Sequence, residues 1–210
     1  MTSLAEAPPL LPGHPVPYHF TAEQSLNMAK AAIFGHEDKL ELIHGVHYHY
    51  SPRTPRDCFA MTSLMYIFLR LCCKTWVVRT QSHIVTADDS IPCPDASIVE
   101  GTIHDYCQFF PTGAQTLLAV EVADSSLRFD LGVKLALYAA AKIPEYWVAD
   151  LAKGKLHVHT LPRGGETPTY RSVTVLGTED EVPLTLRGES FGTIRVGDFL
   201  TPLLSEGVSS

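Results

Sequence analysis

Residues 116–151 read TLLAVEVADSSLRFDLGVKLALYAAAKIPEYWVADL. Two apolar runs of strand length, 116–123 and 145–151, enclose a segment with helical periodicity at about 127–142. The first run is apolar enough for a strand that is buried on both faces. It nevertheless contains Glu121, and a buried carboxylate costs several kcal/mol unless a positive partner meets it. Glu121 is therefore the first candidate for a functional residue.

The helical segment places a second charge among apolar side chains. At about 100° per residue, Lys134 falls in the centre of the apolar stripe, with Asp130 near its edge one turn earlier. The stripe consists of Leu127, Leu131, Leu137, Tyr138 and Ala141. A lysine in this position often extends its ammonium group to water. The alternative is that Lys134 points inward at Glu121, whose neighbours on the same strand face, Ala119 and Ala123, are small enough to leave room.

Asp95 is the third candidate, in the segment SIPCPDASIVEG (residues 90–101). An aspartate after proline is often only a turn residue. Here it opens a short predicted strand at 95–99 that could lie beside the Glu121 strand. An aspartate on one strand, a glutamate on the next and a lysine from the following helix form a pattern typical of metal-dependent phosphodiester cleavage.

The chemistry explains the pattern. Two carboxylates bind a hard divalent cation through oxygen, and the cation polarises the phosphate and lowers the pKa of a bound water. A lysine orients or activates that water and offsets the developing charge. We therefore predict Asp95, Glu121 and Lys134 as catalytic residues. Mg²⁺ or Mn²⁺ would be held by Asp95, Glu121 and the backbone carbonyl of Val122.

These motifs resemble the Uma-two family, a restriction-endonuclease-like branch of the PD-(D/E)xK nuclease superfamily. The matching elements are Pro94-Asp95, Glu121-Val122, Ser125-Ser126, Asp130, Lys134, Tyr138-Ala139, residues 144–150, and the N-terminal Glu41, Leu42, Ile43 and Gly45. The resemblance covers about residues 40–151. It implies a PD-(D/E)xK fold, an α/β domain with a central mixed sheet flanked by helices, and DNA as the substrate.

Two departures from the superfamily pattern matter. The usual E-x-K motif places lysine at the position of Ala123, so the resemblance implies that the lysine has moved to Lys134, in agreement with the stripe. The family often has a histidine at the start of the long helix, whereas residues 51–65 read SPRTPRDCFAMTSLM. Any role for the start of that helix is therefore in doubt.

Three residues are predicted to support the site. Glu41 is a candidate for a further metal ligand or for orienting the attacking water; the alternative is an acid at a strand edge that pairs with Lys39 or Lys74. Gln81 could touch the site through its amide. Asp130 is expected to orient Lys134 at i,i+4 rather than to bind metal.

The rest of the chain completes a single predicted domain, residues 21–203, between a proline-rich arm (1–20) and a flexible tail (204–210). Its other predicted elements are a helix at 21–34 capped by Thr21 and Gln24, a strand pair at 40–50 turning at His44-Gly45, a buried helix at 59–73, a strand at 75–86, a turn at 87–92, and antiparallel hairpins in the last sixty residues. The extra N-terminal strands and C-terminal hairpins surround the central sheet.

Composition limits the function. The chain has 210 residues, 45% hydrophobic and 19% charged, which fits a folded domain, and a net charge of -7, which counts against nucleic-acid binding. A local basic patch or bound cations could supply the missing positive charge. No apolar run has the length of a membrane span, and the first residues show no signal-peptide pattern. Five cysteines without CxxC spacing predict free thiols in a reducing cytoplasm.

Two rival interpretations remain. His47 with His49 and His157 with His159 have the i,i+2 spacing of zinc ligands, but no third ligand completes a site, so exposed strand histidines are favoured. The stronger rival is a catalytically inactive nuclease-fold module for binding or structure. The retained Asp95, Glu121 and Lys134 favour a DNA endonuclease instead. Cutting both strands requires two sites, which makes a homodimer a reasonable expectation, although no sequence feature shows one.

Overall fold

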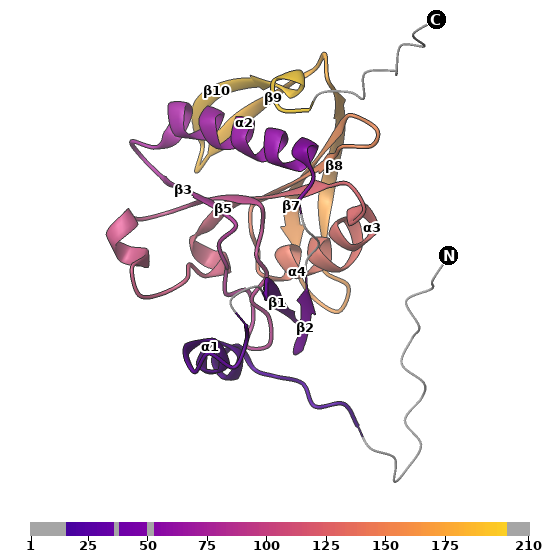
Figure 1. Cartoon of the computed structure of the whole chain (residues 1–210). Helices are drawn as coiled ribbons and strands as arrows, with labels where there is room; N and C mark the ends of the chain where they lie inside the picture. The colour runs from indigo at the N-terminus through magenta and orange to yellow at the C-terminus, as the bar shows by residue number, and fades with distance from the viewer. Residues whose placement is uncertain (1–15, 36–37, 50–52, 201–210) are drawn as a thin grey trace, which may run out of the picture.

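A six-stranded mixed sheet forms the centre of the molecule (Figure 1), and the computed structural model describes residues 16–35, 38–49 and 53–200. The strands lie in the order β3-β4-β5-β6-β7-β8. Their bounds are β3 Val77–Thr80, β4 Ala96–Val99, β5 Thr116–Ala123, β6 Glu145–Asp150, β7 Lys155–Arg163 and β8 Thr169–Gly177. Only β5 and β6 pair in parallel; the other neighbours in this sheet are antiparallel. The predicted mixed central sheet is confirmed.

Strand β5 is the central buried strand that the sequence predicts, with the predicted bounds, and all its residues are buried. Its two faces contribute to different layers. Val120 and Val122 belong to the core beneath helix α2 (Pro55–Cys72), whereas Ala119 and Ala123 pack with residues of helix α4 (Leu135–Ala140). Glu121 therefore lies on the same strand face as the two small alanines.

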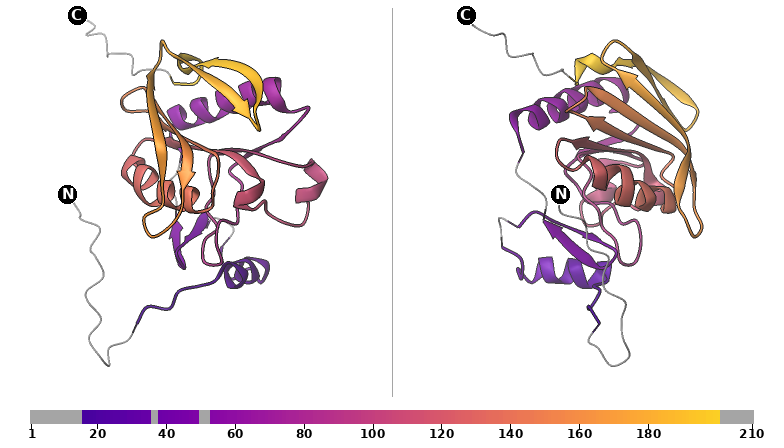
Figure 2. Two further views of the ribbon diagram at one scale, coloured as in Figure 1. Left: turned by 180° about the vertical axis from the view of Figure 1, so that it is seen from behind. Right: turned by 90° about the vertical axis from the view of Figure 1, so that its right-hand side faces the viewer.

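Helix α2 covers one face of the sheet together with the hairpin of β9 (Glu181–Leu186) and β10 (Glu189–Arg195) (Figure 2). It begins earlier than the predicted residue 59, because Thr54 caps it reciprocally with Asp57 and a proline occupies its first turn. Its buried apolar residues are Ala60, Leu64, Phe68 and Cys72, while Phe59, Tyr66 and Leu69 are exposed. The prediction of a helix buried all round was wrong: the spacing of the buried residues shows a single core-facing side.

The segment after β5 is one helical run with an irregular middle. It consists of helix α3 (Leu127–Phe129), the π-helical turn η3 (Asp130–Lys134) and helix α4. The sequence predicts a regular helix over 127–142. A π-helical turn closes its hydrogen bonds over one residue more than an α-helical turn and is common at functional sites. Both charged ends of this turn, Asp130 and Lys134, are buried.

The N-terminal elements β1, β2 and α1 lie together beside one end of the central sheet (Figure 1). Helix α1 (Ala22–Lys30) has the predicted capping box of Thr21 and Gln24. Strands β1 (Leu40–Ile43) and β2 (Val46–His49) form the predicted antiparallel pair. Their turn places His44 and Gly45 at φ 51° and 77°, the left-handed region that a tight hairpin requires.

Other predictions are partly confirmed. The strand predicted at 75–86 is limited to β3, and Gln81 directly after it has φ 44°. The predicted C-terminal hairpins are present as β7-β8 and β9-β10. Short 3-10 segments lie at η1 Ile103–Tyr106, η2 Gly113–Gln115 and η4 Val196–Asp198. The predicted tail, most of the N-terminal arm and Tyr50 lie outside the described residues. Within those residues, no helix has both the length and the hydropathy of a membrane span.

Candidate active site

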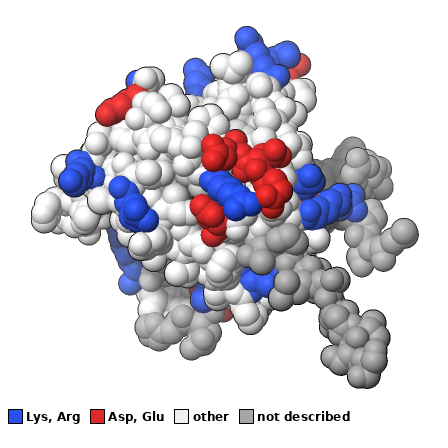
Figure 3. Space-filling view, turned by 90° about the horizontal axis from the view of Figure 1, so that it is seen from above, with Lys and Arg blue, Asp and Glu red and all other residues white. Residues whose placement is uncertain are grey.

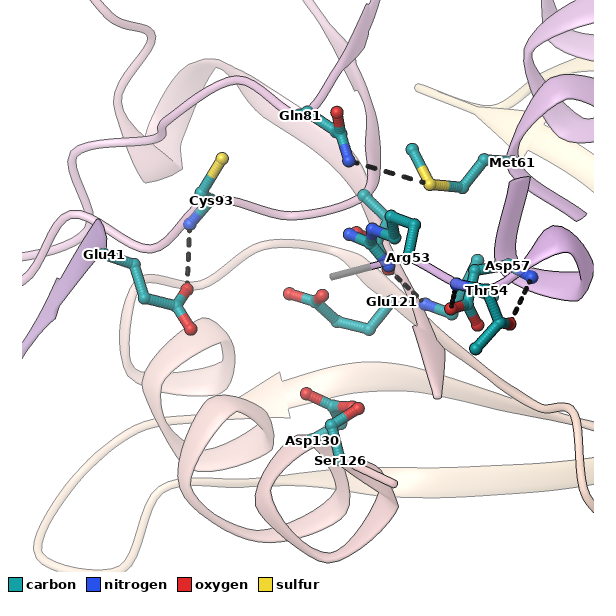
Figure 4. Close-up of polar contacts among 12 residues, drawn as sticks. Glu41, Arg53, Thr54, Asp57, Met61, Gln81, Cys93, Glu121, Ser126 and Asp130 are labelled. Atoms are coloured by element: carbon teal, nitrogen blue, oxygen red, sulfur yellow. Dashed lines mark hydrogen bonds and ion pairs between the residues drawn. The ribbon is translucent and has the colours of Figure 1, made fainter. Parts of the chain in front are cut away.

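Four buried charged residues meet where β4, β5, β1 and the π-helical turn come together. Asp95 directly precedes β4, and the antiparallel register that pairs Ala96 with Val120 brings it beside Glu121. Lys134 and Glu41 reach the same place from η3 and β1. In Figure 4 the carboxylate of Glu121 points towards Glu41. The structure thus brings together the three residues predicted as catalytic and one of those predicted as supporting.

Lys134 points inward. Its Nζ lies 3.0 Å from Glu121 Oε1 and 3.0 Å from Glu41 Oε2, and the residue is only 6% exposed. The alternative in which Lys134 extends into water was wrong. Glu41 pairs with Lys134 rather than with Lys39 or Lys74, and its Oε2 also accepts the backbone N–H of Cys93 at 3.1 Å. Glu41 is therefore part of the buried charge cluster and not an acid at an open strand edge.

Tyr138 holds the same oxygen of Glu121. Its hydroxyl donates a 2.8 Å hydrogen bond to Glu121 Oε1 from helix α4, one turn after Lys134. Sequence reasoning placed Tyr138 in the apolar stripe and in the family motif without giving it a role. A tyrosine one turn after an inward-pointing lysine was the signal that could have identified this contact.

Asp95 is bound by an arginine that sequence reasoning missed. The guanidinium of Arg53 contacts both carboxylate oxygens, with Nη1 3.1 Å from Oδ2 and Nη2 in ion-pair contact with Oδ1. Asp95 Oδ2 also accepts the backbone N–H of Val122 at 2.7 Å. Asp95 is therefore more than a turn residue, because it ties the end of β5 to the segment before α2. Arg53 lies in a segment without hydrophobic periodicity, so the pattern gave no sign of it.

The other two predicted supporting residues are placed differently from expectation. Asp130 Oδ2 accepts a 2.5 Å hydrogen bond from Ser126 Oγ, whereas the ion pairs of Lys134 are with Glu41 and Glu121. No ion pair joins Asp130 to Lys134 among the described residues, but the charge of Asp130 still raises the pKa of Lys134. Gln81 is exposed and its Nε2 faces Met61 Sδ at 4.0 Å, away from the carboxylates (Figure 4).

The cluster has an excess of acid. Glu41, Glu121 and Asp130 face one lysine. Burial alone would lower the pKa of Lys134, but the facing carboxylates outweigh it and raise the pKa above its usual value. Burial raises the pKa of Glu121 to about 8, with Lys134 opposing this shift and Asp130 and Glu41 adding to it. Burial likewise raises the pKa of Asp130. The charged form of Lys134 is thus stabilised, whereas the charged forms of Glu121 and Asp130 remain disfavoured by burial.

This donor set fits a divalent cation. Four buried carboxyl groups, those of Glu41, Asp95, Glu121 and Asp130, lie beside only two cationic side chains, Lys134 and Arg53, and burial raises the pKa of Glu121 and of Asp130. No three Asp, Glu, His or Cys side chains of the described chain are grouped as a ready-made metal cage. Mg²⁺ needs no such cage, because it usually takes one or two carboxylates and keeps several waters.

The paired histidines contact other side chains of the protein. His47 Nε2 lies 2.9 Å from Ser25 Oγ, and the rings of His157 and His159 stack with their centroids 6.4 Å apart. The expectation that these histidines are exposed was wrong for His159, which is 7% exposed and also stacks on Tyr146. The second pair is therefore part of the packed sheet face.

Known proteins provide an independent comparison. The model of the Uma2 family, described as "Putative restriction endonuclease", matches residues 22–193. The fold is similar to a crystal structure described as that of "a putative nuclease belonging to DUF820 from Anabaena variabilis ATCC 29413". The TM-score is 0.67 and the identity 12%, over 86% of this chain and 97% of that chain. No curated protein matches the chain.

Proposed function

The chain belongs to the Uma2 family of putative restriction endonucleases, and from this premise we propose that it is a metal-dependent endonuclease that hydrolyses phosphodiester bonds in DNA. The observation that carries the proposal is the buried contact between Lys134 Nζ and Glu121 Oε1 at 3.0 Å, with Asp95 tied to the next residue of the strand. Buried ion pairs contribute little to stability, so function is the better reason to keep this one.

Asp95, Glu121 and the backbone carbonyl of Val122 are the proposed ligands of Mg²⁺ or Mn²⁺. The Val122 N–H points at Asp95, and the N–H and C=O of one strand residue point to the same side. The Val122 carbonyl therefore faces the same side as the Asp95 carboxylate. When bound, the cation would polarise the scissile phosphate and lower the pKa of a coordinated water.

Lys134 is proposed to act as a hydrogen-bond donor and a positive charge rather than as a base. Its raised pKa keeps it protonated at neutral pH. Two of its three N–H groups are directed at Glu121 and Glu41, which leaves one for a water molecule or a phosphate oxygen. Such a fixed donor stabilises the charge that develops on the phosphate during attack by water.

Glu41 and Tyr138 are proposed as positioning residues. Glu41 holds the ammonium of Lys134 together with Glu121, and Tyr138 holds the Glu121 carboxylate. Burial raises the pKa of the Tyr138 hydroxyl well above its usual value, so the hydroxyl remains a donor.

The face of the molecule that carries α2 and the β9-β10 hairpin offers no broad basic surface for DNA (Figure 3). In the view from above, over α2 and the β9-β10 hairpin, acidic and basic side chains are interspersed and form no broad basic surface (Figure 3). This agrees with the net charge of -7. At the site itself, Arg53, Lys134 and a bound cation would supply the positive charge that phosphate binding requires.

The test is calorimetric titration of Mg²⁺ and Mn²⁺ into the wild type and Glu121→Gln, with both proteins assayed on supercoiled plasmid. We expect metal binding and nicking by the wild type and the loss of both in the variant. A folded wild type that binds neither ion would contradict the proposal and favour an inactive nuclease-fold module. Sedimentation of the active protein would show whether it is the homodimer expected for cutting both strands.

A further inference from the structure

Arg53 lies at the boundary between the buried carboxylates and solvent. It directly precedes Thr54, the N-cap of α2, and its side chain is 22% exposed, whereas that of Asp95 is 3% exposed. Lys134 and Glu121 lie deeper, with side chains 7% and 5% exposed. Among the charged groups of the site, the guanidinium is therefore the one that a large substrate can reach first.

The contact between Arg53 and Asp95 leaves little room for a second cation on the same carboxylate. Nη1 and Nη2 approach Oδ2 and Oδ1 respectively, and Oδ2 already accepts the Val122 N–H. A divalent cation on Asp95 needs these lone pairs and repels a positive guanidinium at the same distance. These contacts occupy three of the about four lone-pair sites of the carboxylate, so the ion competes with the two-pronged contact of Arg53 for Asp95.

A displaced Arg53 would need another anion. Arginine cannot lose its charge in a protein, and its Nε is buried without a hydrogen-bond partner in the described structure. The planar fork of a guanidinium matches phosphate oxygens as well as it matches a carboxylate. A DNA phosphate next to a cation on Asp95 offers such an anion.

We propose that Arg53 is a substrate-binding residue that neutralises Asp95 in the metal-free protein and transfers to a DNA phosphate when a divalent cation takes Asp95. This inference rests on the proposed nuclease function. It gives Arg53 opposite effects on the two ligands: it competes with the metal ion and assists DNA. A permanent structural ion pair would not separate the two effects.

The experiment compares the wild type with Arg53→Gln, Arg53→Lys and the matched control Arg171→Gln, an exposed arginine on the edge strand β8. Mn²⁺ affinity is measured by calorimetry. Affinity for a short fluorescein-labelled DNA duplex is measured by anisotropy in EDTA and in Mn²⁺, in a stopped-flow instrument before products accumulate. Thermal melting followed by circular dichroism verifies that each variant is folded.

We expect Arg53→Gln to bind Mn²⁺ more tightly than the wild type, because the competing cation is gone. Its affinity for the duplex in Mn²⁺ should fall by about 10- to 100-fold, the loss expected for a charge-assisted hydrogen-bonded contact. In EDTA the substitution should have little effect, since Arg53 is then held by Asp95. Arg53→Lys, which keeps the charge without the fork, should lie between, and Arg171→Gln should behave as the wild type.

Other outcomes would overturn the proposal in distinguishable ways. If the wild type binds Mn²⁺ and cuts DNA while Arg53→Gln changes neither affinity, or weakens both in parallel, the role of Arg53 is wrong and the nuclease function stands. If the wild type binds no Mn²⁺, the nuclease function fails and the role of Arg53 fails with it. Should Arg53→Gln not fold, Arg53→Lys decides: unchanged affinity for DNA in Mn²⁺ would refute the transfer to phosphate.

Discussion

Lys134 reaches the Glu121 carboxylate from thirteen residues further along the chain, with Nζ 3.0 Å from Oε1. The E-x-K motif of the superfamily would place the lysine at Ala123, on the strand itself. Here the strand position is a fully buried alanine in the same core cluster as Tyr138, and the ammonium enters from the π-helical turn. The ammonium group therefore still lies beside the glutamate, but it is carried by the turn η3 instead of by strand β5.

Removing the ammonium should therefore damage the fold more than removing one of its partners. Lys134→Met leaves Glu41 and Glu121 buried without a cation, and we expect the free energy of unfolding to fall by about 3–5 kcal/mol in EDTA. Glu121→Gln removes an incompletely compensated acid and should cost much less. Urea unfolding measures both, and equal losses in the two variants would contradict the excess of acid inferred for this cluster.

A divalent cation should stabilise the folded protein by mass action, because the unfolded chain lacks the converging ligands. At an Mn²⁺ concentration about 100 times the Kd, the gain is about 2.7 kcal/mol, seen as a rise in Tm relative to EDTA. Asp95→Asn should abolish the rise. The control is Asp180→Asn, a change of the same kind at an exposed turn outside the site; a rise that persists in Asp95→Asn would place the metal elsewhere.

The sequence predicted the parts of this fold in which one physical pattern dominates. The uniform apolarity of residues 116–123 predicted the bounds of β5. Helical periodicity correctly predicted that Lys134 points towards the sheet, even though η3 is a π-helical turn. The exposed side of α2 was mispredicted, because composition alone does not show which apolar side chains face solvent. Arg53 was missed since its contact with Asp95 spans 42 residues and depends on a loop without periodicity.

Acid should destabilise the protein through His159. Burial, and then the neighbouring His157, lower the pKa of His159 from 6.5 to about 4. As the pH falls, His159 is protonated in the unfolded chain before it is protonated in the folded protein. The stability that the neutral imidazole contributes is therefore complete above about pH 6.5 and is lost as the pH falls towards 4. We expect a loss of about 1–2 kcal/mol between pH 7 and 4.5, after a reduction for partial solvation.

His159→Phe should remove that dependence, since phenylalanine can keep the stacking on Tyr146 and does not titrate. Urea unfolding of both proteins at pH 7 and 4.5 makes the comparison. An equal acid-induced loss in the variant would show that other groups cause it.

Glu145 should act in the opposite direction. Burial raises its pKa from 4.5 to about 7, against the lowering effect of the Trp147 N–H, which donates to Oε1 at 2.5 Å. The folded protein therefore holds this proton more tightly than the unfolded chain. The stabilising contribution is complete below about pH 4.5 and is lost as the pH rises through 7. Above that range the ionised carboxylate is a net cost, which places a pH-sensitive group at the start of β6, outside the candidate site.

Glu145→Gln tests this directly, because the amide oxygen can still accept the Trp147 N–H while carrying no charge. Relative to the wild type, the variant should gain about 1–2 kcal/mol of unfolding free energy between pH 5 and pH 8. The measurement is urea unfolding of both proteins at the two pH values, and taking the difference between them cancels the titration of His159. A difference that is the same at pH 5 and pH 8 would mean that the Glu145 side chain is solvated well enough to ionise at its ordinary pKa.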